Sequence, residues 1–143
     1  MNHVEVTREL SHPRARVFAR YTDHERWGEW TGLGRVRLVK DGAPERDGIG
    51  AIRAFAAAGP LREEVTGYEA PSRMTYRIAA GGFPITDHHG EVVFEETGAG
   101  TRVTWRVRFR SRLPGTGWLI ERGLRRLFTT LLDRLARDLG RRH

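Results

Sequence analysis

The feature that most constrains the fold is a long amphipathic stretch near the C-terminus, residues 117–139. Apolar residues recur there at helical spacing, and they are Ile120, Leu124, Leu127, Phe128, Leu131, Leu132 and Leu135. Arginines lie away from most of that stripe, at Arg122, Arg125, Arg126, Arg134 and Arg137. Gly140 is expected to end the helix. The apolar stripe must be buried, and the concave face of a sheet is the surface that the rest of the chain offers.

Most of the preceding sequence alternates apolar and polar residues, which predicts β-strands. The clearest is 102–110, where Val103, Trp105, Val107 and Phe109 alternate mainly with arginines. The predicted strands are residues 3–10, 35–40, 49–56, 61–69, 73–80, 87–96 and 102–110. Outward-facing glutamates of 87–96 are expected to pair with arginines of the last strand, each pair contributing about 0.2–1 kcal/mol.

Two short helices are predicted directly after the first strand. Ser11 or His12 can cap the first one, and Pro13 suits its first turn because proline lacks the N–H that has no partner there. Asp23 can cap the second, which places Trp27 and Trp30 on the same side.

This order of elements resembles the START-like superfamily, also called SRPBCC, and most closely its polyketide cyclase/dehydrase and lipid-transport branch. The resemblance rests on VEVTRELSHPRARVFARYTDHERWGEW, the GGFPITDHHGEVVFEE hairpin, the TRVTWRVRF strand and the terminal helix. It covers essentially the whole chain, so one domain is expected over residues 1–143.

The resemblance implies an α+β helix-grip fold. In it, a curved antiparallel seven-stranded sheet wraps around a long C-terminal helix, with two short helices after the first strand. Members of the superfamily bind lipids, polyketides, plant hormones or similar apolar molecules between sheet and helix. The arginine-rich last strand and helix depart from the family pattern and leave open a ligand with an anionic group.

Charge and composition limit the kinds of binding partner and the cellular location that we expect. The formal net charge is +7, and 24 of the 25 basic residues are arginine. Such a bias is typical of a GC-rich genome and of solvated surfaces, so no nucleic-acid partner is expected. No stretch has the length of unbroken apolar sequence that a membrane helix needs, so membrane insertion is not expected either. The chain has no cysteine, which excludes disulfides and thiolate catalysis and fits a cytoplasmic location. No secretory signal is recognised at the N-terminus.

A ligand-binding cavity is predicted between sheet and helix. The ligand-binding candidates are Trp27, Trp30, Phe55, Tyr76, Phe83, His88, Trp105, Phe109, Phe128 and Leu131. Tyr21 and Met74 are further inward-facing candidates. The alternative is that these side chains simply pack a dry core.

The polar candidates are Tyr76, His88 and Arg53. Strand parity points His88 inward, whereas Asp87 before it faces the other side and is poorly placed to share a proton. Tyr76 can donate a hydrogen bond to a ligand carbonyl or to a buried backbone group. Arg53 either turns inward to pair with a ligand carboxylate or lies on the outer face opposite Glu63 or Glu64.

Three functions remain open. The leading hypothesis is binding or carriage of a small hydrophobic ligand, without a cofactor. The second is a polyketide cyclase, aromatase or dehydratase with His88 and Tyr76 as acid/base groups. The third is an interaction module whose arginine-rich helix binds an acidic partner or membrane.

The histidine spacing matches no metal motif, and the glycine-rich stretches never open a helix, so neither a metal site nor a phosphate cradle is expected. A monomer and a homodimer are both open.

Overall fold

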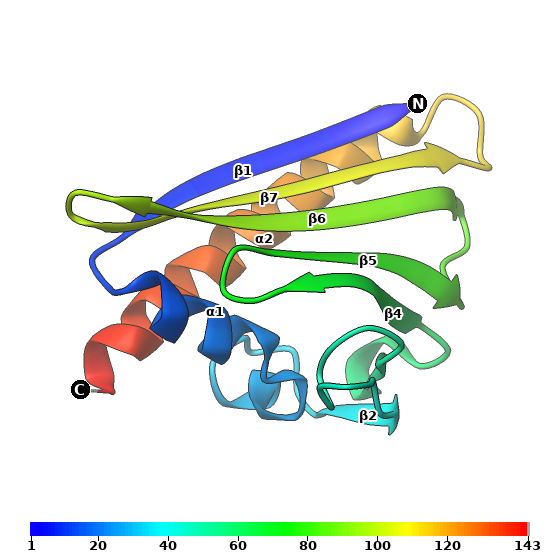
Figure 1. Cartoon of the computed structure of the whole chain (residues 1–143). Helices are drawn as coiled ribbons and strands as arrows, with labels where there is room; N and C mark the ends of the chain where they lie inside the picture. The colour runs from blue at the N-terminus through cyan, green and yellow to red at the C-terminus, as the bar shows by residue number, and fades with distance from the viewer. Residues whose placement is uncertain (143) are drawn as a thin grey trace.

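A computed structural model describes residues 1–142 of the chain (Figure 1). The strands are β1 (Asn2–Leu10), β2 (Val36–Lys40), β3 (Ile52–Phe55), β4 (Arg62–Glu69), β5 (Arg73–Ala80), β6 (Ile85–Thr97) and β7 (Gly100–Ser111). The α-helices are α1 (Arg14–Thr22) and α2 (Gly117–Arg141), and two short 3₁₀ helices are η1 (His24–Glu29) and η2 (Ala56–Ala58).

All seven strands form one antiparallel sheet in the order β1-β7-β6-β5-β4-β3-β2. Strands β2 to β7 follow one another as a meander, and β1 returns to the far edge beside β7 (Figure 1). The predicted helix-grip fold with seven strands is therefore confirmed.

The β6–β7 hairpin is built as its alternating pattern predicts. Val103, Trp105 and Val107 are buried on one face, while the arginines of β7 lie on the other. Arg106 contacts Glu91 of β6 at 2.9 Å, which confirms the expected glutamate–arginine pairing. Arg102 instead contacts Glu9 of β1 at 2.7 Å. These exposed pairs contribute little stability each, but they give the outer arginines an ordinary structural role.

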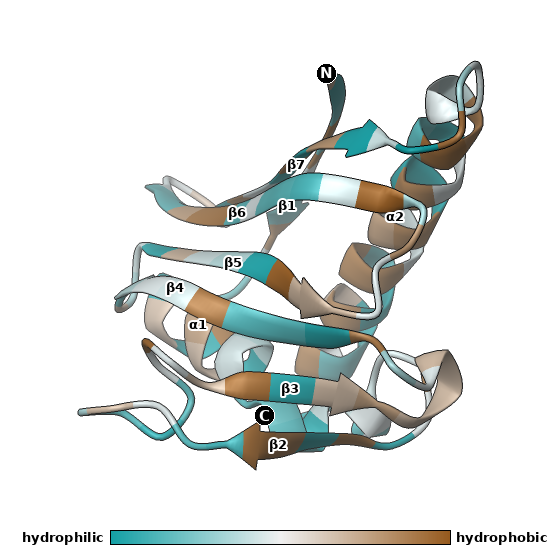
Figure 2. Cartoon of the chain, turned by 90° about the vertical axis from the view of Figure 1, so that its right-hand side faces the viewer, coloured by the Kyte–Doolittle hydropathy of each residue, from teal (hydrophilic) through white to brown (hydrophobic). Residues whose placement is uncertain are grey.

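Helix α2 crosses one face of the sheet diagonally and packs along β1 (Figures 1 and 2). Its buried side chains are Phe128, Leu131, Leu132, Leu135 and Leu139. Arg20 of α1 holds the far end of α2 through Asp138, with N–O distances of 2.8 and 3.0 Å. The two helices are thus tied together on the same side of the sheet, as burial of the apolar stripe requires.

Several predicted elements differ from the structure at their ends by one or two residues, and the predicted side-chain caps of the two short helices do not form, since Pro13 is the N-cap of α1 and Asp23 makes no capping hydrogen bond. Two of the differing ends have a clear physical reason. The last helix continues through Gly140, because Arg16 donates to the carbonyls of Leu139 and Arg142 and so satisfies groups that a glycine cap would otherwise serve. The predicted strand 49–56 is shorter, since Gly50 has a φ of 90° and interrupts the extended backbone before Ile52.

Candidate functional site

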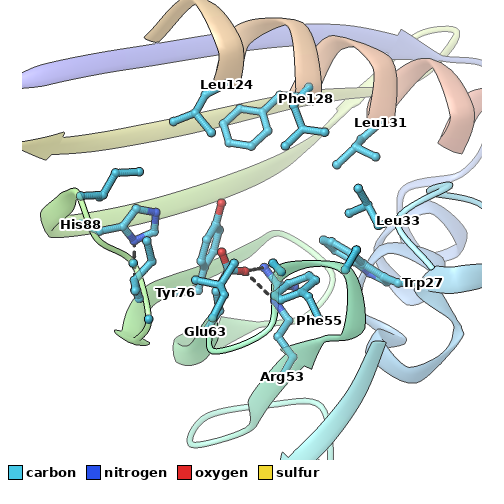
Figure 3. A pocket seen from close by; sticks show the side chains of 18 of the residues that line it. Trp27, Leu33, Arg53, Phe55, Glu63, Tyr76, His88, Leu124, Phe128 and Leu131 are labelled. Atoms are coloured by element: carbon cyan, nitrogen blue, oxygen red, sulfur yellow. Dashed lines mark hydrogen bonds and ion pairs between the residues drawn. The ribbon is translucent and has the colours of Figure 1, made fainter. Parts of the chain in front are cut away.

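A cavity of about 450 Å³ lies between α2 and the sheet. A volume of roughly 300–1,000 Å³ is typical of small-molecule sites. Its walls come from η1 and η2, from β3 to β7, from the loops that carry Leu33, Leu61 and Gly82, and from α2 (Figure 3). The apolar part of the wall includes Leu33, Ala57, Ala58, Leu61, Ile78, Ile85, Leu124 and Leu127. The interior is therefore mostly apolar and large enough for a small guest.

Seven of the ten side chains predicted for ligand binding line this cavity. They are Trp27, Phe55, Tyr76, His88, Trp105, Phe128 and Leu131. Phe128 stacks on Trp105 with ring centroids 4.2 Å apart, so α2 and β7 share one aromatic wall.

The other three side chains predicted for ligand binding lie outside the cavity lining. Phe83 is 71% exposed on the turn between β5 and β6, where the chain reverses and has no facing strand to cover it. Trp30 is buried behind Trp27, with ring centroids 5.4 Å apart. Phe109 is buried in the core, but it does not line the cavity. Tyr21 and Met74 are also buried outside the lining, as core packing would have them.

Arg53 turns inward, and its partner Glu63 turns inward with it. The two residues are directly opposite each other in the β3–β4 register, so they share a face of the sheet. The Arg53 Nε and Nη2 atoms lie 2.9 and 2.7 Å from Oε1 of Glu63. Sequence reasoning missed Glu63 as a cavity residue, although its hairpin register opposite Arg53 was a usable signal.

The Arg53 guanidinium is 1% exposed and sits among aromatic rings. Its Cζ lies 4.4 Å from the ring centroid of Trp27 and 4.9 Å from that of Tyr76. Burial, the largest single effect, lowers the pKa of Arg53, but the groups around the guanidinium, foremost the Glu63 carboxylate, together raise that pKa, so the side chain stays charged. The site thus holds a complete ion pair in an apolar setting.

Gly90 allows Tyr76 to lie across β6. The two residues face each other in the β5–β6 register, and a Cβ atom at position 90 would lie 2.3 Å from Cζ of Tyr76. The Tyr76 hydroxyl accepts a hydrogen bond of 2.8 Å from Trp105 Nε1. Burial raises the pKa of Tyr76 well above its ordinary value, so the hydroxyl keeps its proton. The hydroxyl group can therefore still donate a hydrogen bond.

A bulge in β6 aims His88 into the cavity. The register shifts between Thr86 and His89, and Asp87 in between has a φ of 51°. This extra residue places both Ile85 and His88 on the cavity wall. Asp87 instead contacts Arg110 at 3.4 Å, and both of these side chains are exposed. Asp87 and His88 therefore do not form an acid/base dyad.

Hydrogen bonding fixes the protonation of His88. Its Nδ1 accepts a 3.1 Å hydrogen bond from the backbone N–H of Ile78, so the ring proton is on Nε2. Burial, with smaller contributions from the charges of His89 and Arg53, lowers the pKa of His88 to about 4. At neutral pH His88 is an uncharged hydrogen-bond donor through Nε2.

We expect this lowered pKa to make stability depend on pH. The unfolded chain takes up a proton near pH 6.5 and the folded chain only near pH 4, so His88 costs stability as pH falls through that window, by on the order of 2 kcal/mol at pH 4.5. Asparagine at position 88 can still accept from the Ile78 N–H but does not titrate. Urea unfolding at pH 7 and pH 4.5 should therefore show a smaller acid-induced loss for His88→Asn than for the wild type.

His24, whose pKa is also lowered by burial, is present in both proteins and cancels in that difference. Equal losses in wild type and variant would contradict the assigned protonation state of His88.

The fold and the cavity together define a helix-grip protein of the START-like, or SRPBCC, superfamily. The chain belongs to the polyketide cyclase/dehydrase and lipid transport family, whose sequence model matches residues 1–140. No curated protein matches the sequence at a significant level.

Solved structures are similar over the whole chain. A protein from Thermobifida fusca is 25% identical, with a TM-score of 0.82 over 99% of this chain and 95% of that one. A START superfamily protein from Mycobacterium smegmatis is 12% identical, with a TM-score of 0.82 over 100% of both chains. DynU16, from the dynemicin biosynthetic locus, is 18% identical, with a TM-score of 0.71 over 98% of this chain and 48% of DynU16. The last two likenesses concern the fold alone.

Within residues 1–142, no helix has the length and apolar character needed to cross a membrane.

Proposed function

We propose that the chain binds and carries a small apolar molecule in the cavity beneath α2. The observation that carries this proposal is a mostly apolar space of about 450 Å³, with aromatic walls, inside a chain of the polyketide cyclase/dehydrase and lipid transport family. Burial of apolar ligand surface would supply most of the affinity, at about 25 cal/mol per Å² before the costs of association. We also expect the protein to act in the cytoplasm, given its lack of cysteine.

The protonation states of the cavity favour a carrier over a cyclase or dehydratase. A general base needs a free lone pair and a general acid needs a proton that it can release near neutral pH. His88 has its Nδ1 lone pair engaged by Ile78 and its proton on Nε2. The raised pKa of Tyr76 makes its hydroxyl a poor acid. Both groups are better suited to hydrogen bonding than to proton transfer.

Filling the cavity should weaken ligand binding strongly. Leu124 faces the cavity from α2, so Leu124→Trp places extra volume where the ligand would lie. We expect it to weaken binding of N-phenyl-1-naphthylamine, a neutral fluorescent probe, by more than about tenfold, because a space packed to protein density admits no guest. Fluorescence titration measures this change.

Leu119→Trp is the matched control. Leu119 is on the same helix but 56% exposed and outside the cavity lining. Its variant should bind the probe as the wild type does. Equal probe affinity in Leu124→Trp and the wild type would overturn the proposed function.

A further inference from the structure

The polar groups of the cavity determine which ligand fits, provided that the proposed function holds. Among the described lining residues, side chains with hydrogen-bonding groups are confined to Trp27, Arg53, Glu63, Tyr76, His88 and Trp105. The two indole N–H groups already donate, to Tyr21 O at 2.6 Å and to the Tyr76 hydroxyl at 2.8 Å. Four side chains therefore remain to recognise a ligand.

The charges among these four are already balanced. Glu63 takes the Nε and Nη2 donors of Arg53, which form one of the two guanidinium edges able to bind a carboxylate, and it balances the Arg53 charge. An anionic ligand would add an unpaired negative charge to this buried site, and such a charge is costly without a partner. The ion pair thus opposes a fatty acid or another carboxylate, contrary to the anionic ligand that the arginine-rich sequence left open.

The groups still available are mainly donors. The Tyr76 hydroxyl accepts from Trp105, which leaves its own proton to give. His88 carries its proton on Nε2, because Nδ1 accepts from Ile78. Figure 3 shows the Tyr76 hydroxyl pointing toward Phe128, with the His88 ring on the same side of the space beneath α2. Both donors suit an oxygen that accepts hydrogen bonds.

One further polar atom of the lining supports a ligand oxygen in the cavity. Arg53 Nη1 is buried, and it makes no hydrogen bond to the described residues. A buried donor without an acceptor is costly. A ligand oxygen, or a water held beside it, relieves that cost.

We propose that the cavity selects an uncharged apolar molecule with a carbonyl oxygen, held by Tyr76 and His88, and that the Arg53–Glu63 pair discriminates against carboxylates. The ligand class is thus a neutral aromatic or aliphatic ketone, not an acid.

Three probes of matched shape test this proposal: 2-acetylnaphthalene, 2-isopropylnaphthalene and 2-naphthoate. Each is titrated at pH 7.5 as a competitor of N-phenyl-1-naphthylamine. The ketone should bind about tenfold more tightly than the hydrocarbon, and the carboxylate should bind at least about tenfold more weakly than the ketone. Equal affinities for ketone and hydrocarbon, or tightest binding of the carboxylate, would overturn the selectivity while leaving the proposed function intact. Failure of all four compounds to bind would overturn the proposed function itself.

Glu63→Gln is expected to change the selectivity of the cavity in favour of a carboxylate. Glutamine keeps the shape of Glu63 and an oxygen acceptor for Arg53, but it leaves the guanidinium charge unbalanced in the cavity. The variant should bind 2-naphthoate at least about tenfold more tightly than the wild type does. Partial unfolding would expose apolar surface to 2-naphthoate and 2-isopropylnaphthalene alike, so a gain confined to 2-naphthoate reports the unbalanced charge. The absence of any such gain in folded protein would contradict the role of the ion pair.

Tyr76→Phe provides a second, independent variant. It removes the donor and keeps the ring, so the advantage of the ketone over the hydrocarbon should shrink by about threefold or more. Tyr68→Phe, outside the cavity lining, is the control and should leave that advantage unchanged. If Tyr76→Phe still binds the ketone more tightly than the hydrocarbon by the same factor, the proposed hydrogen bond from the Tyr76 hydroxyl to the ligand is contradicted.

Discussion

Arg53→Met is expected to lower the free energy of unfolding by about 3–5 kcal/mol, the cost of breaking a buried ion pair on one side. The substitution removes both contacts to Glu63 and the stacking of the guanidinium over Trp27. Glu63, whose side chain is mostly buried, then carries its charge without a partner. Urea unfolding followed by far-ultraviolet circular dichroism measures the loss.

The double variant Arg53→Met, Glu63→Met separates charge from packing. Methionine fills most of the volume at both positions, and replacing a whole buried pair by apolar side chains is often neutral or stabilising. The double variant should therefore regain most of the stability lost in Arg53→Met. If the double variant is as unstable as the single one, the cost lies in packing, and the ion pair is not the cause.

Leu135→Ala should cost about 2–5 kcal/mol, the range for truncating a buried leucine and leaving a cavity. Leu135 is fully buried in the stripe of α2 and lies outside the cavity lining. The variant should thus lose stability but, while folded, still bind N-phenyl-1-naphthylamine. Thermal and urea unfolding measure the first effect, and fluorescence titration measures the second.

The matched control for Leu135 is Leu119→Ala. Leu119 is 56% exposed near the start of the same helix, so its truncation should change stability by no more than about 0.5 kcal/mol. Equal destabilisation of the two variants would mean that α2 does not pack against the sheet through its leucine-lined side.

The fold could be predicted because its two main patterns are regular over many residues. The alternation of Val103, Trp105 and Val107 fixes the buried face of β7, and the leucine spacing fixes the buried side of α2. Gly140 misled the prediction of the helix end, because the contacts of Arg16 come from a helix more than 100 residues earlier in the chain. Capping by a distant side chain leaves no local signal.

The site was less predictable, because a cavity depends on where packing stops. Trp27 and Trp30 have the same local pattern, yet only Trp27 reaches the cavity, since it stands in front of Trp30. Strand parity gave the direction of His88 correctly, whereas the bulge at Asp87 was invisible in the alternation. The fit of Tyr76 over Gly90 depends on strand register, which a glycine in the sequence does not reveal by itself.

The central claim is that a guest enters the space between α2 and the sheet, and the tryptophan indoles test it most directly. Trp27 and Trp105 line the cavity, whereas Trp118 is 63% exposed on α2 outside it. The four indole signals in a ¹H–¹⁵N spectrum of labelled protein are assigned with the single variants Trp27→Phe, Trp105→Phe and Trp118→Phe. Saturating N-phenyl-1-naphthylamine should shift the indole signals of Trp27 and Trp105 and leave that of Trp118 in place. A shift at Trp118 alone, with both cavity indoles unmoved, would contradict the account.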